Sequence, residues 1–266
     1  MTTSQIPELK LPVPQSAAFD TDVDADLDVD NGFFDAPAFA AETLADWRKL
    51  ASVIDHTLLK PEATRTQVEN LCDEAIRYRF ACAMVNPVWA STAAGLLAGT
   101  GVPLGVVIGF PLGASLGSTL RQEAAALCKL GAKELDMVLS IGQLKSGEHA
   151  AVERTVRGVA EVAHDHGALL KVILETCLLS VEEKLRASEI AIQAGTDFLK
   201  TSTGFSTGGA TAADVALLRG VAGARAGVKA SGGIRTLADA RAMLEAGANR
   251  IGASASVGMV RELGAE

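Results

Sequence analysis

The sequence predicts an α/β protein built as a (β/α)8 TIM barrel, preceded by a short N-terminal helix. The main observation is that eight short apolar or β-branched runs alternate with stretches rich in Ala, Leu and Glu. The chain has 266 residues, which suits a single barrel of about 250 residues. The eight predicted strands are Ser52–His56, Ala81–Asn86, Leu104–Gly109, Glu134–Leu139, Leu169–Glu175, Asp197–Thr201, Gly227–Ala230 and Arg250–Ala253.

The stretches between these runs have apolar residues at helical spacing, for example in Ser118–Leu130 and Val181–Ala194. Several of them end on a glycine, Gly131, Gly195 or Gly247, as expected where a helix stops before the next strand. The alternative is an open, doubly wound sheet, but no GxGxxG motif follows the first predicted strand. A closed parallel barrel is therefore the better prediction.

Acidic residues are concentrated at the N-terminus. The first 46 residues carry ten acidic side chains and one lysine, although the whole chain has a net charge of only -8. An aspartate at every second position from Asp20 to Asp30 extends the chain by repulsion, and this run does not fit a calcium-binding loop. We expect residues 1–42 to form a disordered acidic tail and residues 43–266 to form the catalytic barrel. The nearly neutral remainder indicates no nucleic-acid surface.

Composition and cysteine usage indicate where the protein works. No run of about 18 uncharged apolar residues occurs, so no membrane span is expected, and no secretory signal is visible. The cysteines are far apart and form no CxxC motif, which favours reduced, buried thiols in a cytoplasmic protein. They are Cys72, Cys82, Cys128 and Cys177.

Ionisable residues occur at the ends of five predicted strands. The carboxyl ends of barrel strands meet at the face where barrel enzymes have their active sites, and buried charges there are unfavourable unless paired. One alternative is a network of ion pairs that only stabilises the barrel. That alternative does not explain why glycine-rich turns follow the two lysines. The five residues are Asp55, Asp136, Glu175, Lys200 and Lys229.

The two lysines occupy similar contexts, FLKTSTGF around Lys200 and VKASGGIR around Lys229. A lysine is nucleophilic only as a neutral amine, and burial or a second nearby cation lowers its pKa. Lys200 is therefore a candidate to attack a carbonyl group and form a Schiff base. Asp136, with Asp55 as a second candidate, could then move protons to and from the intermediate.

Glycine-rich turns after the last three strands could bind a phosphate group. They offer backbone N–H groups at Gly204, at Gly232–Gly233 and at Gly252–Ser254. The loops after strands seven and eight are the usual phosphate site of a barrel. The histidines do not have the spacing of a zinc site, so we expect no metal and no cofactor.

Eight motifs together resemble the deoxyribose-phosphate aldolase family, in order and spacing, from about residue 50 to residue 260. They are IDHTLLKP (54–61), MVNP (84–87), VIGFPLG (107–113), ELDMVL (134–139), KVILET (171–176), FLKTSTGF (198–205), VKASGGIR (228–235) and RIGAS (250–254). This chain departs from the family in three respects. Some members end in a tyrosine implicated in proton transfer, whereas the only tyrosine here is Tyr78. The other two departures are single residues. Ala255 stands where members often have a second serine, and Met84 where a cysteine is common.

The resemblance implies a metal-free class I aldolase that works in deoxyribose phosphate catabolism. It would reversibly cleave 2-deoxy-D-ribose 5-phosphate to acetaldehyde and D-glyceraldehyde 3-phosphate, acting on phosphorylated sugar and aldehyde substrates as a homodimer or homotetramer. By motif, Lys200 matches the Schiff-base lysine, Lys229 the lysine that lowers its pKa, and Asp136 the acid of the proton relay. The substrate-binding positions of the family fall on Asp55, Thr203, Gly204, Gly232, Gly233 and Ser254.

Two alternatives remain open from the sequence. Another barrel aldolase or phospho-sugar enzyme would share the lysine chemistry and prefer a different aldehyde. A non-enzymatic barrel could instead serve as a scaffold whose acidic tail binds a basic partner.

Overall fold

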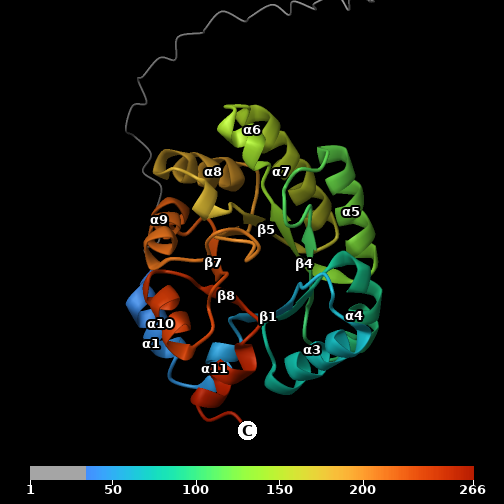
Figure 1. The fold of residues 1–266 in the computed structure, drawn as a ribbon, viewed down its shortest axis with the longest axis vertical. Coiled ribbons are helices and arrows are strands. Elements are labelled where there is room, and N and C mark those ends of the chain that lie inside the picture. The colour runs from blue at the N-terminus through green and yellow to red at the C-terminus, as the bar shows by residue number, and fades with distance from the viewer. Residues whose placement is uncertain (1–33) are drawn as a thin grey trace, which may run out of the picture. The chain divides into compact units, whose positions relative to one another are not determined.

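The computed structural model describes residues 34–266. Eight parallel strands close into a barrel in which each strand pairs with its neighbours in the chain and β8 pairs with β1 (Figure 1). The predicted fold is therefore confirmed. The strands are β1 (Ile54–Leu58), β2 (Cys82–Val85), β3 (Leu104–Ile108), β4 (Ala132–Val138), β5 (Leu169–Ile173), β6 (Phe198–Lys200), β7 (Gly227–Ser231) and β8 (Arg250–Ala253).

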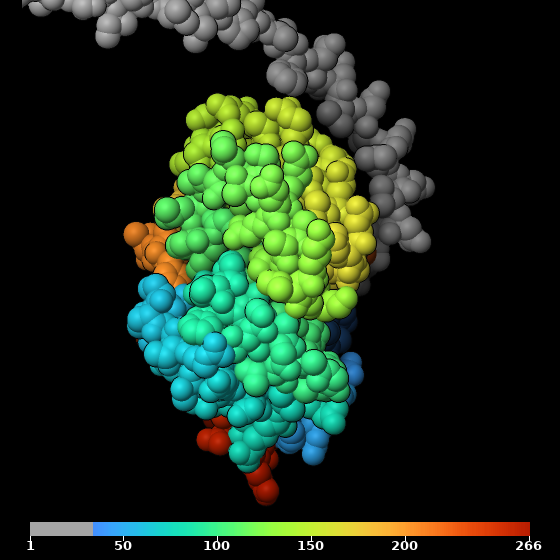
Figure 2. Space-filling view, turned by 90° about the vertical axis from the view of Figure 1, so that its right-hand side faces the viewer, coloured from blue at the N-terminus to red at the C-terminus, as the bar shows by residue number. Residues whose placement is uncertain are grey.

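Helices surround the strands and cover the outside of the barrel (Figure 1). Figure 2 shows one side of the molecule as packed atoms, coloured by residue number. Those that connect successive strands are α3 (Arg65–Tyr78), α4 (Ala90–Leu97), α5 (Gly117–Lys129), α6 (Ile141–Lys145), α7 (His149–Asp165), α8 (Val181–Gln193), α9 (Ala212–Ala222) and α10 (Leu237–Glu245). Two short 3-10 helices, η1 (Pro87–Trp89) and η2 (Thr176–Leu178), follow β2 and β5, and α11 (Ser256–Glu262) follows β8.

Two N-terminal helices precede the first strand, α1 (Ala36–Thr43) and α2 (Trp47–Ala51). The N-cap of α1 is Asp35, whose carboxylate accepts a hydrogen bond from the Ala38 amide at 2.9 Å. This helix packs beside α10 (Figure 1). Its residue Ala40 is buried and belongs to the apolar core. The expected boundary at residue 42 thus falls inside a helix, because small apolar residues after Asp35 do bury a face. The acidic run from Asp20 to Asp30 lies outside the described residues.

The predicted helix ends were accurate to within a residue for the two helices specified, α5 and α8. Gly131 and Gly247 follow helices with φ of +107° and +111°, values that side chains with a Cβ atom rarely adopt. Each glycine therefore ends a helix and lets the chain turn into the next strand.

The apolar core has two parts. The larger part, made of aliphatic side chains, lies between the strands and the helices. A smaller cluster lies apart from it and consists of Leu59, Cys82, Met84 and Val107, with Phe110 packed against it. Gly105 makes room for this cluster, since a Cβ atom there would approach Cys82 Sγ and Met84 Cε to about 2.5 Å.

The four cysteines are free thiols, but they are not all buried. Cys72 and Cys82 are buried, Cys128 is half-buried and Cys177 is exposed. The expectation was wrong for Cys177 because this residue lies in η2, at the end of the barrel where the strands finish, and not within a strand or a long helix. Among the helices of residues 34–266, none has the length and apolar character to cross a membrane.

Candidate active site

The registers of the barrel strands place charged side chains on its inner face. Asp136 is the register partner of Lys171 on β5, and Lys200 is the partner of Lys229 on β7. Glu134 lies two residues before Asp136 on β4, so both side chains point to the same face of the strand. Sequence-distant charged groups are thereby brought into one buried cluster.

Asp136 contacts both of the lysines that the sequence singled out. Its Oδ2 accepts hydrogen bonds from Lys200 Nζ and from Lys229 Nζ, each at 2.7 Å. Asp136 is completely buried, and Lys200 and Lys229 are 3% and 1% exposed. The two lysines expected at the reaction centre therefore share one oxygen atom of Asp136 as their hydrogen-bond acceptor.

Asp55 belongs to the same cluster but does not open towards a pocket. It is fully buried, and its Oδ2 accepts hydrogen bonds from Lys229 and, at 3.1 Å, from Lys171. Burial acts to raise the pKa of Asp55, but Lys171, Lys229 and Arg250 outweigh burial and lower the pKa to about 2. In this structure Asp55 is an ionised partner of Lys229.

Three further charged residues complete the cluster, and the sequence reasoning did not identify them. Lys171 Nζ lies 2.9 Å from Asp136 Oδ1 and 2.5 Å from Glu134 Oε2. Arg250 Nη2 lies 2.8 Å from Glu134 Oε1, and its Nε lies 3.5 Å from Asp55 Oδ1. None of the three residues lies at the carboxyl end of its strand, whereas the search considered only those ends. Glu134 was recognisable from its spacing of two residues from Asp136, which places it on the same face.

The charges of this cluster single out Lys200. Four basic side chains face three carboxylates, so the charges balance when one base is neutral. Burial lowers the pKa of Lys200 to about 8, and the nearby Lys229 and Lys171 act in the same direction against the pull of Asp136. By contrast, Lys171 contacts three carboxylates, which hold its pKa well above the ordinary value although burial opposes them. Of Lys171 and Lys200, Lys200 is thus the lysine that loses its proton more easily.

Asp136 remains ionised next to Lys200. Burial favours the protonated acid, but Lys171, Lys200 and Lys229 together hold the pKa of Asp136 well below its usual range. Asp136 is therefore present as a charged hydrogen-bond acceptor beside the amine of Lys200.

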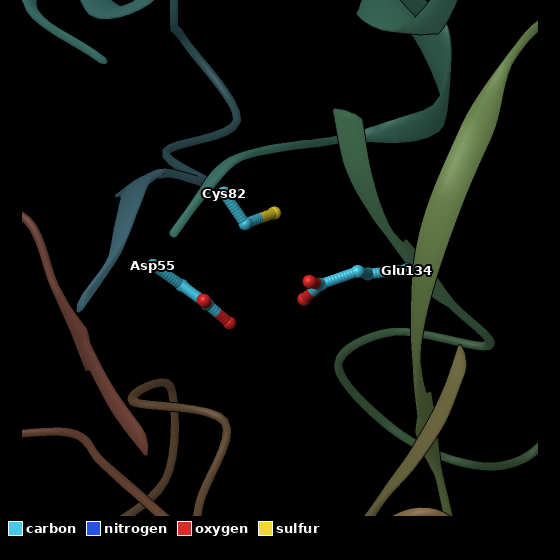
Figure 3. Close-up of side chains that lie close together, drawn as sticks. All are labelled: Asp55, Cys82 and Glu134. Carbon is cyan, nitrogen blue, oxygen red and sulfur yellow. The ribbon is translucent and has the colours of Figure 1, made fainter. Parts of the chain in front are cut away.

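Three side chains of the barrel interior carry atoms that could bind a metal ion, those of Asp55, Cys82 and Glu134. Figure 3 shows that they point towards one another. Their ligand atoms lie within 4.8 Å of one another, as in a metal site. However, Lys171 already bonds both carboxylates, and Arg250 lies beside them. Burial, Glu134 and Asp55 raise the pKa of the Cys82 thiol well above its usual value, so no thiolate is available. The group is suited to an ammonium ion and not to a divalent metal.

A cavity of about 360 Å³ opens beside the loops after β6, β7 and β8. Gly204 and Gly232 have φ of +83° and +85°, a conformation that favours glycine. Because glycine has no side chain, the backbone at these two positions is uncovered at the cavity wall. Two basic residues that the sequence reasoning did not single out, Lys60 and Arg235, also line it. The predicted phosphate-binding residues Gly204, Gly232, Gly233 and Ser254 all contribute to the wall of this cavity.

Thr203 lines the same cavity, but its hydroxyl group already has partners. It donates a hydrogen bond to the carboxylate of Glu175 and accepts one from the Phe205 amide at 3.0 Å. The predicted strand containing Glu175 ends earlier, at Ile173, and Glu175 lies beyond it with a positive φ. The structure therefore shows Thr203 as part of the loop framework.

Phe110 and Phe205 bring the loops after β3 and β6 together. Their rings meet edge to face, with centroids 5.2 Å apart and an interplanar angle of 87°. Phe205 borders the 360 Å³ cavity, while Phe110 borders a second cavity of about 640 Å³ beside Leu112 and Glu123. The aromatic pair thus lies between two cavities.

Comparisons with known proteins show which family this chain resembles. Residues 49–260 match the model of the DeoC/LacD family aldolases. The chain is 54% identical to the deoxyribose-phosphate aldolase of Geobacillus sp. (strain WCH70), over 79% of this chain and 94% of the relative. It is 54% identical to the enzyme of the same name from Listeria monocytogenes serovar 1/2a, with the same coverage of both chains.

Among solved structures, the tetrameric deoxyribose phosphate aldolase from Aeropyrum pernix superposes with a TM-score of 0.80 at 39% sequence identity. The match covers 86% of this chain and 96% of that one. The buried lysine cluster and the barrel are consistent with these similarities to aldolases. The chain belongs to the DeoC/LacD family of aldolases.

Proposed function

We propose that this protein is a class I aldolase that reversibly cleaves 2-deoxy-D-ribose 5-phosphate to acetaldehyde and D-glyceraldehyde 3-phosphate. The names of its relatives support the substrate. The observation that carries the mechanism is the environment of Lys200, a buried amine with a pKa of about 8 that lies 2.7 Å from a carboxylate. An amine of this kind is partly neutral near neutral pH and can act as a nucleophile.

In the direction of synthesis, the neutral Lys200 amine attacks the carbonyl carbon of acetaldehyde and forms a carbinolamine. Loss of the carbinolamine hydroxyl group as water leaves an iminium ion. Asp136 Oδ2 is the proposed acceptor of the proton that nitrogen loses in the addition, since it already accepts a hydrogen bond from Lys200. Lys229, which bonds the same oxygen, is the proposed group that restores a proton during dehydration.

Removal of a proton from the methyl carbon of the iminium ion gives an enamine. Its carbon attacks the aldehyde carbon of glyceraldehyde 3-phosphate and forms the new carbon–carbon bond, while the aldehyde oxygen takes up a proton. Water then hydrolyses the new iminium ion, which releases the sugar phosphate and regenerates the amine. Cleavage follows the same steps in reverse.

The phosphate group is proposed to bind in the 360 Å³ cavity. Gly204, Gly232 and Gly233 would supply backbone donors, and Ser254 a hydroxyl group. Lys60 and Arg235 would add positive charge. For Asp55, the geometry favours a role in holding Lys229, and for Thr203 a role in shaping the loop, over direct contact with substrate hydroxyl groups.

Turnover of 2-deoxy-D-ribose 5-phosphate, followed by detection of both aldehyde products, tests the reaction. Lys200→Leu should abolish cleavage, because no other group would form the covalent intermediate. Asp136→Leu should reduce kcat by a factor of about 10²–10⁴. A donor and acceptor screen would reveal a different phospho-sugar aldolase as a preference for another pair of aldehydes.

Assembly, location and domain organisation are also proposals. We infer a homo-oligomer, supported by the tetramer of the Aeropyrum pernix relative. We infer a cytoplasmic location, supported by four unpaired cysteines. The catalytic domain is proposed to begin at α1, near residue 36, and to follow an acidic tail.

A further inference from the structure

Glu175 has an unusual backbone conformation at the carboxyl end of β5. Its φ and ψ are +55° and +62°, a left-handed conformation that residues with a Cβ atom rarely adopt. Its side chain is buried, since the residue is only 2% exposed. A strained residue of this kind persists only when its surroundings hold it in place, and such residues cluster at functional sites.

The carboxylate of Glu175 is bonded mainly by a single residue. The Thr203 amide lies 3.3 Å from each carboxylate oxygen, and the Thr203 hydroxyl group donates to Oε2. Within residues 34–266, no lysine, arginine or histidine nitrogen forms an ion pair with it. A buried carboxylate needs strong hydrogen-bond donors. Thr203 supplies two of them, its amide and its hydroxyl group, so the Glu175 carboxylate depends on this one residue.

Thr203 transmits this contact to the wall of the phosphate cavity. Its hydroxyl oxygen accepts a hydrogen bond from the Phe205 amide at 3.0 Å, which fixes the turn around Gly204. Thr203, Gly204 and Phe205 all line the cavity, whereas Glu175 is not among its lining residues. Glu175 therefore fixes the positions of these three wall residues through its hydrogen bonds to Thr203, although it does not line the cavity itself.

Lys200 is held by different contacts. Its carbonyl oxygen accepts a hydrogen bond from the Leu174 amide at 2.9 Å, and the following residue bonds Lys229 through the backbone at 3.1 Å. Its amine contacts Asp136. The backbone hydrogen bonds that hold Lys200 and Thr201 come from Leu174 and Thr176, on either side of Glu175, and none comes from the Glu175 side chain. A change confined to that side chain, as in Glu175→Gln, can therefore alter the loop without displacing the amine.

We propose that Glu175 is a positioning residue that shapes the loop after β6 to receive the phosphate group of the substrate. The inference rests on the proposed function, because it assigns the phosphate of deoxyribose 5-phosphate to the adjoining cavity. Glu175 acts through Thr203 and touches neither the reacting carbonyl carbon nor the phosphate. It determines how well the enzyme distinguishes a phosphorylated sugar from the same sugar without phosphate.

The test compares 2-deoxy-D-ribose 5-phosphate with 2-deoxy-D-ribose in three variants of the full chain. Glu175→Gln keeps the shape and removes the charge. Glu175→Gly removes the acceptor and tolerates the positive φ, so it relieves strain and favours folding. Glu189→Gln is the matched control, because this carboxylate pairs with Arg225 on the outside of the barrel.

Both Glu175 variants should raise KM for the phosphorylated sugar by at least about tenfold, as expected when hydrogen bonds to a charged group are lost. For the unphosphorylated sugar, kcat/KM should stay within about twofold of wild type, as for the control. The rate of borohydride trapping with acetaldehyde should also stay the same. Selectivity for phosphate is the readout, since general destabilisation would affect both sugars equally.

A second set of variants changes Thr203, the other residue of this contact. Thr203→Val removes the hydroxyl donor and keeps the side-chain shape, so it should reproduce the loss of phosphate selectivity. The double variant Glu175→Gln/Thr203→Val should be no worse than the worse single variant, because both remove one interaction.

Equal losses on both sugars, a slower trapping reaction, or unchanged KM for the phosphorylated sugar would each overturn the assignment. Additive losses in the double variant would also overturn it, because they would mean that Glu175 does not act through Thr203. Failure of the proposed function has a different signature. The wild-type protein itself would then neither cleave deoxyribose 5-phosphate nor be trapped with acetaldehyde.

Discussion

Lys171 Nζ lies 2.9 Å from Asp136 Oδ1, the carboxylate oxygen that neither Lys200 nor Lys229 contacts. Oδ1 of Asp136 is therefore paired with Lys171, which stays charged. Oδ2 bonds Lys200 and Lys229, the two lysines of the proposed reaction. Because Lys171 keeps its proton, it fixes the ionised state of Asp136 and also opposes a positive charge on Lys200. This arrangement allows the amine of Lys200, and not that of Lys171, to become neutral.

Replacing Lys171 with methionine should shift the pH dependence of the reaction. In the wild type, kcat/KM should rise with pH through about 8 as the Lys200 ammonium loses its proton. Lys171→Met removes a cation, so the pKa of Lys200 rises and the rising limb moves to higher pH. Activity at pH 7 should fall accordingly. Kinetics from pH 6 to about pH 10 check this.

Lys184→Met is the control for that variant, because Lys184 pairs with Asp214 between two outer helices at 2.5 Å. It should leave the pH profile unchanged. Lys171→Met should also lower the free energy of unfolding by about 3–5 kcal/mol, since it leaves buried carboxylates without their partner. An unshifted pH profile in a folded Lys171→Met protein would show that Lys171 does not influence Lys200.

Replacing Lys200 with methionine should abolish activity and stabilise the fold. The pKa of Lys200 is lower in the folded chain than the usual 10.5, so the unfolded chain binds its proton more tightly. The resulting penalty is fully present below about pH 8 and disappears as the pH rises towards 10.5. We expect Lys200→Met to raise the free energy of unfolding by roughly 1–3 kcal/mol at pH 7. Urea denaturation at pH 7 and pH 10 measures this difference, which should be smaller at pH 10.

Gly252 provides the space in which Lys229 lies. A Cβ atom at this position would lie 3.0 Å from Lys229 Cε and 3.7 Å from its Nζ. Gly252→Ala should therefore displace the Lys229 ammonium from Asp136, raise the pKa of Lys200 and reduce kcat at pH 7 by about tenfold. In the control Gly95→Ala the new methyl group meets nothing within 4 Å, and kcat should not change. Full activity of Gly252→Ala would mean that the position of Lys229 is not critical.

Two N-terminal truncations separate the acidic tail from α1. Removal of residues 1–33 should leave cleavage activity and stability unchanged. Removal of residues 1–43 deletes α1, which buries Ala40 and Thr43, and should lower the free energy of unfolding by about 2–4 kcal/mol. Assays of both proteins, with thermal unfolding, provide the comparison. A large loss of activity in the shorter truncation would assign the tail a role in catalysis or assembly.

The sequence predicted the barrel well because its strands are short, apolar and regularly spaced between helices. It also singled out Lys200, Lys229 and Asp136, and in the structure both lysines bond one oxygen of Asp136. These residues were recognisable because a charge in an apolar strand requires a partner. The pairing itself is a consequence of strand register, which sequence alone does not give.

The rest of the cluster could not be predicted for the same reason. Lys171 and Glu134 lie one or more residues deeper in the barrel than the strand ends, and only closure of the barrel places them beside Asp136. Likewise, the sequence could place Thr203 near the phosphate cavity but could not show that its hydroxyl group is bonded to Glu175. Partners that are 28 residues apart are set by the tertiary structure.

Borohydride reduction in the presence of acetaldehyde, followed by peptide mapping, tests the central claim most directly. Reduction of the iminium ion leaves an ethyl group on the lysine that formed it. We expect the full-length protein to carry one ethyl group, on Lys200, with more labelling at pH 8 than at pH 6 because more of the amine is neutral. An ethyl group on Lys229 or Lys171, or no labelling in an active enzyme, would contradict the assignment of Lys200 as the nucleophile.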